Sequence, residues 1–142
     1  MRDNIVITFG TFDLFHIGHL NILNRCKKYG NKLIVGISSD NLNYVKKGRK
    51  PIYNENDRMN IIKNIKCVDD VFIEDKLEDK IKYCKKYNAN VFIIGDDWKD
   101  KIIPGLNITF DEQLKDVCEV IYLKRTDNIS TTDTIINIKN YY

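Results

Sequence analysis

Short apolar runs alternate along this chain with stretches whose apolar residues recur every three or four positions. The apolar runs predict β-strands at residues 5–9, 32–38, 71–73, 91–94 and 118–123. Two of them, 5–9 and 91–94, are apolar at every position, which is typical of strands buried on both faces. The helical patterns cover residues 16–29, 56–66 and 77–87, and a last one opens at Ser130. This alternation predicts an α/β fold, a Rossmann-like, doubly wound, five-stranded parallel sheet with helices on both faces.

The length and composition of the chain limit its class. The 142 residues suit a single domain, 1–142, and the content of 43% hydrophobic and 30% charged residues indicates a folded globular protein. No apolar run is long enough for a membrane span or a signal peptide, so we expect a cytoplasmic protein without a membrane partner. The widely spaced cysteines are expected to be buried, reduced thiols rather than zinc ligands. They are Cys26, Cys67, Cys84 and Cys118.

The first predicted strand leads into GTFDLFHIGH, residues 10–19, which contains both histidines of the chain. Gly10 permits a sharp turn or the close approach of a ligand. His16 and His19 are expected in the first turn of the next helix, on one face, with Gly18 exposing backbone between them. A helix start with free N–H groups favours an anion, most often phosphate, and its positive field favours neutral imidazoles.

Two other interpretations of this stretch remain open from the residues alone. The histidines could be ordinary helix residues beside a tight turn. A metal site would need a third ligand, for which Asp13 is available.

A second helix start has similar chemistry. Ser130 is a good N-cap with an acid, Asp133, three positions later. Arg125 precedes it, and the planar guanidinium group of arginine suits phosphate oxygens. The alternative is a capped terminal helix with a surface arginine.

Three motifs together resemble a known family. GTFDLFHIGH is similar to the HxGH signature of the nucleotidyltransferases, which transfer a nucleotide from CTP or ATP onto a phosphate. RTDNISTT, residues 125–132, is similar to the RTxGIST element of the cytidylyltransferases, and GDDW, residues 95–98, follows the fourth predicted strand. Over residues 5 to about 136, the chain most resembles the glycerol-3-phosphate cytidylyltransferase family. Asn128 stands where that family usually has glycine, and asparagine tolerates left-handed backbone better than most residues.

The resemblance implies a single cytidylyltransferase domain that transfers CMP from CTP to glycerol 3-phosphate. It implies a homodimer, with Mg²⁺ bound to CTP rather than held by a protein metal site. The implied catalytic residues are His16, His19, Lys46 and Arg125. The implied nucleotide-binding residues are Gly10, Thr11, Phe12, Asp13, Gly18, Gly95, Asp96, Asp97, Arg125, Ile129, Ser130 and Thr131. The implied acceptor-binding residues are Lys46, Arg58 and Asp13.

For some of these residues, a role without any ligand contact remains an alternative. Lys46 belongs to the basic segment KKGRK, residues 46–50, which is also consistent with a solvated loop. Arg58 could be a solvated helix residue, and the GDDW acids could belong to a polar loop after a strand.

Alternative functions come from three classes. The nearest is another transferase of the superfamily, such as a phosphocholine or phosphoethanolamine cytidylyltransferase, or an FMN or sugar-phosphate adenylyltransferase. A non-catalytic nucleotide-binding module would not need the histidines, Lys46 or Arg125. A nucleic-acid-binding protein would need a wide basic face, and the net charge of +3 does not predict one. Residue spacing does not distinguish glycerol, ribitol, erythritol or an amino alcohol as the group behind the acceptor phosphate.

Overall fold

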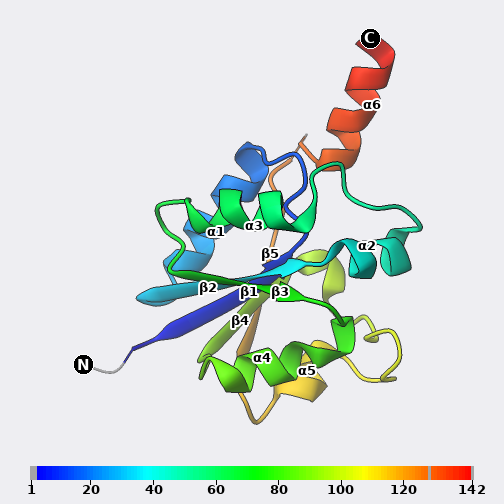
Figure 1. Ribbon diagram of the computed structural model, residues 1–142. Coiled ribbons are helices and arrows are strands. Elements are labelled where there is room, and N and C mark those ends of the chain that lie inside the picture. Colours follow the sequence, from blue (N-terminus) through cyan, green and yellow to red (C-terminus); the bar gives the residue numbers. More distant parts are fainter. Residues whose placement is uncertain (1–2, 128, 142) are drawn as a thin grey trace.

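The computed structural model describes residues 3–127 and 129–141, and its centre is one parallel sheet. The strand order is β3-β2-β1-β4-β5 (Figure 1). The strands are β1 (Ile5–Gly10), β2 (Lys32–Ser38), β3 (Asp70–Glu74), β4 (Val91–Gly95) and β5 (Glu119–Leu123). The predicted five-stranded Rossmann-like sheet is confirmed, because each apolar run forms a strand whose ends differ from the prediction by no more than one residue.

Helices cover both faces of the sheet, as the alternation predicts (Figure 1). They are α1 (Ile17–Lys27), α2 (Asp40–Lys47), α3 (Glu55–Lys63), η1 (Leu77–Asp79), α4 (Lys80–Lys86), η2 (Asp96–Trp98), α5 (Phe110–Leu114) and α6 (Thr131–Tyr141). Leu23 of α1 and Ile62 of α3 are buried in the core on one face, and Cys84 of α4 and Leu114 of α5 on the other. Within the described residues, none of the helices has the length and hydropathy that a membrane span requires.

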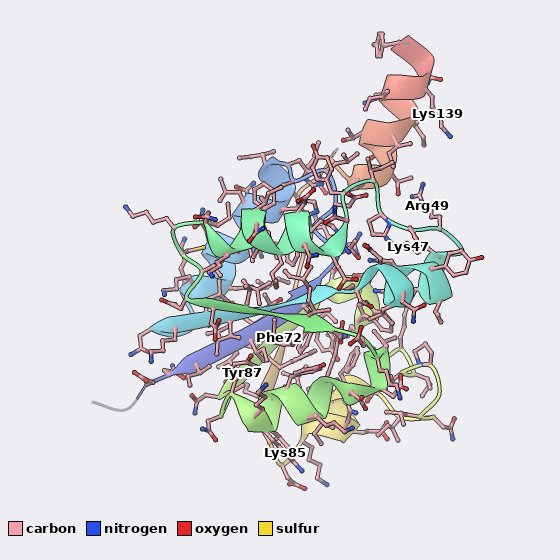
Figure 2. The ribbon with its side chains drawn as sticks, in the orientation of Figure 1. Lys47, Arg49, Phe72, Lys85, Tyr87 and Lys139 are labelled. Atoms are coloured by element: carbon pink, nitrogen blue, oxygen red, sulfur yellow. The ribbon has the colours of Figure 1, made fainter. Side chains whose placement is uncertain are left out.

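The edge strand β3 shows how one face is packed. Phe72 of β3 stacks with Tyr87, which follows α4, at a centroid distance of 5.1 Å (Figure 2). All four cysteines are free thiols, with Cys26 and Cys84 buried and the other two only partly so. The expectation of reduced thiols therefore agrees with the structure, whereas full burial holds for only two of them.

Helix α2 corrects the interpretation of the basic segment 46–50 as a loop. Lys46 and Lys47 form the last turn of α2, and only the residues after them are loop. The helix begins because the Ser39 hydroxyl accepts a hydrogen bond from the N–H of Leu42, and it ends because Gly48 adopts a left-handed conformation with φ of 73°. With only eight residues and few apolar ones, α2 has too weak a periodicity to be predicted from sequence.

The sheet order places the carboxyl ends of β1 and β4 side by side at the point where the chain changes direction across the sheet. From β1 the chain continues outward through β2 to β3, and from β4 it continues the other way to β5. In open parallel sheets, ligands bind beyond the carboxyl ends of the strands at such a point. The stretch 10–19 follows β1, and GDDW follows β4, so both lie at this edge.

Candidate active site

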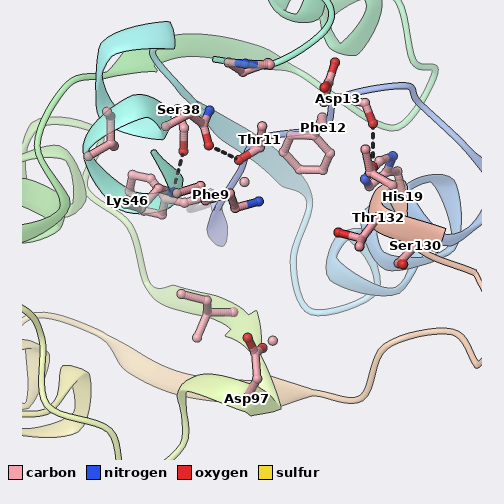
Figure 3. A pocket seen from close by; sticks show the side chains of 18 of the residues that line it. Phe9, Thr11, Phe12, Asp13, His19, Ser38, Lys46, Asp97, Ser130 and Thr132 are labelled. Atoms are coloured by element: carbon pink, nitrogen blue, oxygen red, sulfur yellow. Dashed lines mark hydrogen bonds between the residues drawn. The ribbon is translucent and has the colours of Figure 1, made fainter. Parts of the chain in front are cut away.

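A cleft of about 890 Å³ opens at the carboxyl ends of β1 and β4 (Figure 3). It brings together the two predicted anion sites, which are more than 100 residues apart in sequence. Its lining includes Gly10, Thr11, Phe12, Asp13, His16, Gly18, His19, Lys46, Gly95, Asp97, Arg125, Ile129, Ser130 and Thr131. Two of the expected site residues, Asp96 and Arg58, are absent from that lining. Asn128 lies outside the described residues.

The two histidines form the start of α1. His16 is the N-cap, one position before the first turn in which the sequence places it, and its Nδ1 accepts from the N–H of Gly18 at 3.0 Å. His19 Nδ1 accepts from the N–H of His16 at 3.2 Å, which completes a capping box made of imidazoles. The two rings stack at 3.8 Å, so the shared face is confirmed. The cap also occupies the Gly18 N–H group, which the sequence analysis expects to be free.

Hydrogen bonding and burial fix the protonation of both rings. Because each Nδ1 is an acceptor, the proton of the neutral imidazole is on Nε2. Burial lowers the pKa of His16, and burial with the neighbouring His16 lowers the pKa of His19 to about 4. Both rings are therefore neutral near pH 7 and present Nε2–H donors. The Nε2 atom of His16 is buried and has no hydrogen-bond partner among the described residues.

The segment before α6 is tied directly to the stretch before α1. The Thr131 hydroxyl donates to the carbonyl of Asp13 at 2.7 Å. Gly18 is needed for this approach, because a Cβ there would lie 3.2 Å from the Ile129 side chain and 2.8 Å from the His16 ring. Ser130 caps α6 as predicted, since its hydroxyl accepts from the N–H of Asp133 at 3.0 Å.

Arg125 reaches the cleft from the end of β5. Its guanidinium group donates to the Asp97 carboxylate at 3.1 Å, and the side chains are 69% and 42% exposed. Both charges therefore stay accessible to a ligand, and such an exposed pair contributes little to stability. The arginine and the second acid of GDDW are thus brought together, whereas Asp96 is not part of the lining.

Asp13 and Gly10 have structural roles that the sequence analysis does not predict. The Asp13 carboxylate accepts from the N–H groups of Ile52 at 2.7 Å and Tyr53 at 2.9 Å, so it holds the chain between α2 and α3. Gly10 makes room for the Phe12 ring, which would lie 2.8 Å from a Cβ at that position. Phe12 is itself buried and contacts His19 edge-on at 5.4 Å. Because Asp13 also lines the cleft, direct contact of its carboxylate with a ligand stays a prediction.

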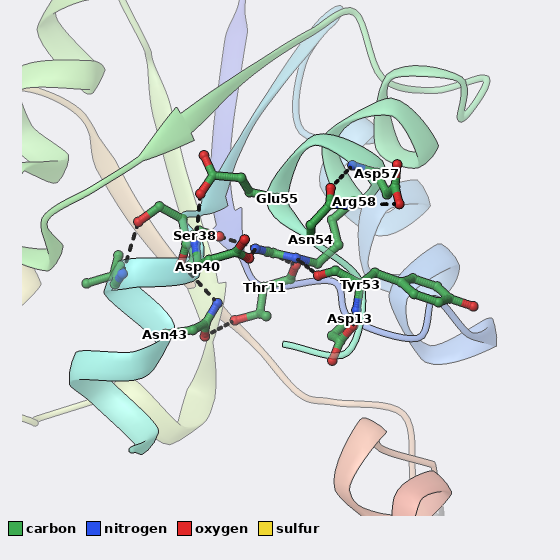
Figure 4. Close-up of polar contacts among 12 residues, drawn as sticks. Thr11, Asp13, Ser38, Asp40, Asn43, Tyr53, Asn54, Glu55, Asp57 and Arg58 are labelled. Atoms are coloured by element: carbon green, nitrogen blue, oxygen red, sulfur yellow. Dashed lines mark hydrogen bonds and ion pairs between the residues drawn. The ribbon is translucent and has the colours of Figure 1, made fainter. Parts of the chain in front are cut away.

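Arg58 is a buried support beneath the cleft (Figure 4). Its side chain is 0% exposed, and its guanidinium group donates to the carbonyls of Thr11 at 2.8 Å and Ser38 at 2.7 Å. It also donates to the Tyr53 carbonyl and pairs with the Asp40 carboxylate at 2.8 Å. The expected acceptor contact of Arg58 is therefore corrected, because its donors are bound to the protein and it does not line the cleft.

Lys46 does lie in the cleft, where its ammonium group donates to the Ser38 hydroxyl at 3.3 Å (Figure 3). Burial, together with the nearby Lys80, lowers the pKa of Lys46 to about 8. Lys80 and Glu74, which no sequence motif indicates, form a buried ion pair that also lines the cleft. Their only sequence signal is an acid at the carboxyl end of a predicted strand, because Lys80 belongs to no motif.

The family of the chain follows from this architecture and from one comparison. Residues 7–137 match the family model described as Cytidylyltransferase-like. The chain belongs to the cytidylyltransferase-like family. It is thus a nucleotidyltransferase, and the cleft is the candidate active site of this cytidylyltransferase.

Curated relatives extend the similarity over most of the chain. The cytidylyltransferase is 46% identical to a glycerol-3-phosphate cytidylyltransferase of Bacillus spizizenii, over 89% of this chain and 91% of the relative. It is 40% identical to a glycerol-3-phosphate cytidylyltransferase of Staphylococcus aureus, over 89% of each chain. Among solved structures, the lipopolysaccharide core biosynthesis protein from Thermoplasma volcanium GSS1 has the same fold. It matches with a TM-score of 0.71 at 24% identity, over 89% of this chain and 100% of the other.

Proposed function

We propose that this cytidylyltransferase transfers CMP from CTP to glycerol 3-phosphate, which gives CDP-glycerol and pyrophosphate. The observation that most supports the proposal is the meeting of two helix starts in one cleft, joined by the hydrogen bond from Thr131 to Asp13. The similarity to two curated glycerol-3-phosphate cytidylyltransferases along nearly their full length supports the same acceptor.

The reaction requires positioning more than covalent chemistry. An oxygen of the acceptor phosphate attacks the α-phosphorus of CTP, a new P–O bond forms, and the bond to the β-phosphate breaks to release pyrophosphate. The nucleophile belongs to the substrate, so the protein needs only to align two polyanions and to stabilise charge as it moves.

The histidines are suited to the α-phosphate. Neutral rings whose Nε2–H groups are free can donate hydrogen bonds to the α-phosphate and bridging oxygens as the five-coordinate state develops. The buried, unpartnered Nε2 of His16 supports this role, because a phosphate oxygen would supply its missing acceptor. The capping bonds at both Nδ1 atoms hold the rings in place before CTP arrives.

The remaining cations divide between the two substrates. We assign Arg125, with the hydroxyl of Ser130 and the start of α6, to the β- and γ-phosphates, because that end of the cleft is a helix N-terminus. We assign Lys46 and Lys80 to the acceptor phosphate. In Figure 3, Lys46 lies on the opposite side of the view from His19 and Ser130, and all three residues line the same cleft.

We propose that Mg²⁺ enters the cleft with CTP. Magnesium keeps most of its water and is commonly bound through substrate phosphates with one or two carboxylates. The exposed Asp97 carboxylate beside Arg125 fits such a contact. The ion would neutralise part of the triphosphate charge, and the residues of the cleft would orient the phosphates.

We also propose that the chain works as a cytoplasmic homodimer. Helix α6 extends away from the sheet (Figure 1), and its side chains Ile136, Ile138 and Tyr141 are exposed. Apolar side chains of this kind are suited to contact with a second copy. The free thiols of all four cysteines support a reducing compartment. Sedimentation of the purified protein tests the dimer, and a monomer at micromolar concentration would contradict it.

A substrate panel tests the reaction. Purified protein is supplied with Mg²⁺, either CTP or ATP, and glycerol 3-phosphate, ribitol 5-phosphate, erythritol 4-phosphate, phosphocholine, phosphoethanolamine or FMN. Pyrophosphate release is followed. We expect the highest kcat/KM with CTP and glycerol 3-phosphate. A preference for ATP or for another acceptor would replace the proposal with a different transferase, and CTP binding without turnover would indicate a non-catalytic module.

A further inference from the structure

The carboxylate of Glu74 lies at the acceptor end of the cleft with one oxygen unused. The side chain is 0% exposed, and its Oε2 accepts from the ammonium group of Lys80 at 2.5 Å. Its Oε1 has no hydrogen-bond partner among residues 3–127 and 129–141. Both residues line the cleft. A buried carboxylate oxygen without a donor is costly, and a ligand that supplies the donor recovers that cost.

The surroundings of Glu74 are strongly cationic. The Lys80 ammonium group is 2% exposed and lies 4.6 Å from the centroid of the Phe9 ring. Lys46, the second lysine at this end, is held by Ser38. Burial lowers the pKa of Lys80 and raises that of Glu74, while each partner opposes the shift of the other. At their contact distance of 2.5 Å, each member of the pair stabilises the charged form of the other against this effect of burial.

These features specify the chemistry of a group that could reach Oε1. The oxygen needs a hydrogen-bond donor, which excludes an ether or a bare alkyl group. Two nearby ammonium groups disfavour a cationic donor such as an amino alcohol. A hydroxyl is a neutral donor, and it would enter beside a phosphate attracted by Lys46 and Lys80.

We propose that Glu74 determines acceptor specificity, with its Oε1 accepting a hydrogen bond from a hydroxyl of the phosphorylated polyol. This inference rests on the proposed function, because it names the part of the acceptor that the cleft recognises. In this arrangement Lys46 and Lys80 bind the phosphate of the acceptor, and the Glu74 carboxylate binds a hydroxyl of its alcohol part.

Hydroxyl deletion tests the inference in the wild-type protein and in Glu74→Gln. The acceptors are glycerol 3-phosphate and its two monodeoxy analogues, 3-hydroxypropyl phosphate and propane-1,2-diol 1-phosphate. We expect wild type to lose roughly 10- to 100-fold in kcat/KM with the analogue that lacks the recognised hydroxyl, the scale of one hydrogen bond to a charged group. In Glu74→Gln, Lys80 retains the amide oxygen, so the NH₂ group faces the acceptor. The loss in kcat/KM on deletion of the recognised hydroxyl should then be smaller than in the wild type by at least about tenfold. The ratio of kcat/KM between glycerol 3-phosphate and the other analogue should stay constant.

Two further variants make the result decisive. Glu74→Asp keeps a charge near Lys80 but withdraws the carboxylate by one methylene. It should therefore also reduce the difference in kcat/KM between glycerol 3-phosphate and the analogue that lacks the recognised hydroxyl. This variant replaces Glu74→Gln in the test if Glu74→Gln folds poorly. Asp75→Asn removes an exposed carboxylate one residue later, outside the cleft lining, and should leave all three ratios unchanged. If both Glu74 variants lower kcat/KM by the same factor for every acceptor, Glu74 only supports Lys80 and the inference is wrong. Absence of transfer to any acceptor by the wild type would instead overturn the proposed function.

Discussion

At the scale of single residues, the two histidines use their ring nitrogens for different purposes. The Nδ1 atoms cap α1, and the Nε2 atoms are left as donors toward the cleft. The lowered pKa values of the two imidazoles keep both rings neutral near pH 7, so each ring keeps its Nε2–H donor there. A capping box built from imidazoles therefore fixes both the start of α1 and the geometry of the donors that we propose to be catalytic.

Substitution of either histidine should separate these two functions. We expect His16→Ala and His19→Ala each to lower kcat by about 10²–10³, the usual effect of losing one transition-state donor. His16→Asn is the matched variant, because asparagine is a good N-cap but lacks Nε2. It should restore the thermal stability lost in His16→Ala without restoring kcat, as measured by pyrophosphate release and thermal melting. Wild-type turnover in both alanine variants would remove the histidines from the mechanism.

Lys46 should impose an upper pH limit on acceptor binding. With its pKa lowered to about 8, the side chain is charged below that pH and loses its proton as the pH rises through it. KM for glycerol 3-phosphate should therefore increase above about pH 8. In Lys46→Arg the charge persists, since arginine stays protonated, and this increase should disappear. The measurement is KM from pH 6.5 to 9.5, and an identical pH profile in the two proteins would contradict the assignment.

At the scale of elements, the site depends on how α1 and α6 are held together. None of the residues of α6 is buried, and those that line the cleft, Thr131, Thr132 and Ile135, belong to its first five positions. The hydrogen bond from Thr131 to the Asp13 carbonyl and the close approach of Ile129 to Gly18 fix that start beside the histidines. The N-termini of α1 and α6 thereby face the same cleft, so that both helix dipoles can act on one anionic ligand.

Removing the Thr131 hydroxyl should weaken this junction. We expect Thr131→Val to raise KM for CTP by roughly fivefold, because one hydrogen bond contributes about 1 kcal/mol. Asn137→Ala, at an exposed position further along α6, is the control and should bind CTP as the wild type does. Both variants are compared by initial rates over a range of CTP concentrations. An unchanged KM in Thr131→Val would show that the junction does not set the CTP site.

At the scale of the whole molecule, Arg58 connects parts of the chain that surround the cleft. It bonds to the loop after β1, the end of β2, the start of α2 and the segment before α3. Its complete burial means that the guanidinium charge relies on these partners rather than on water. The cleft therefore has a rigid base on its β2 side.

Replacing Arg58 should destabilise the fold. Arg58→Met leaves several buried carbonyls and the Asp40 carboxylate without their donor, and we expect a loss of about 3 kcal/mol in the free energy of unfolding. For a domain of this size, that corresponds to a fall in Tm of roughly 10 °C. Arg25→Met, which removes a more exposed arginine that donates to the Lys124 carbonyl, is the control and should lower Tm far less. Equal Tm changes in both variants would contradict the supporting role.

Features that depend on neighbouring residues in the sequence could be predicted, whereas features that depend on tertiary packing could not. Strand positions and the cap at Ser130 could be predicted because apolar periodicity and capping chemistry act within a few residues. Helix α2 could not, because it is short and few of its residues are apolar. Glu74 and Lys80 escaped prediction because burial turned two ordinary charged residues into part of the cleft.

The sequence by itself determined the order of strands and helices along the chain, the motifs after β1 and before α6, and hence the class of chemistry. Only the tertiary structure decided which motif residues face the cleft and which support it. Arg58 belongs to the second group and Asp13 to both, because their hydrogen-bond partners come from distant segments. The partners and the burial of a side chain depend on how the whole chain packs, so they cannot be predicted from the neighbouring residues in the sequence.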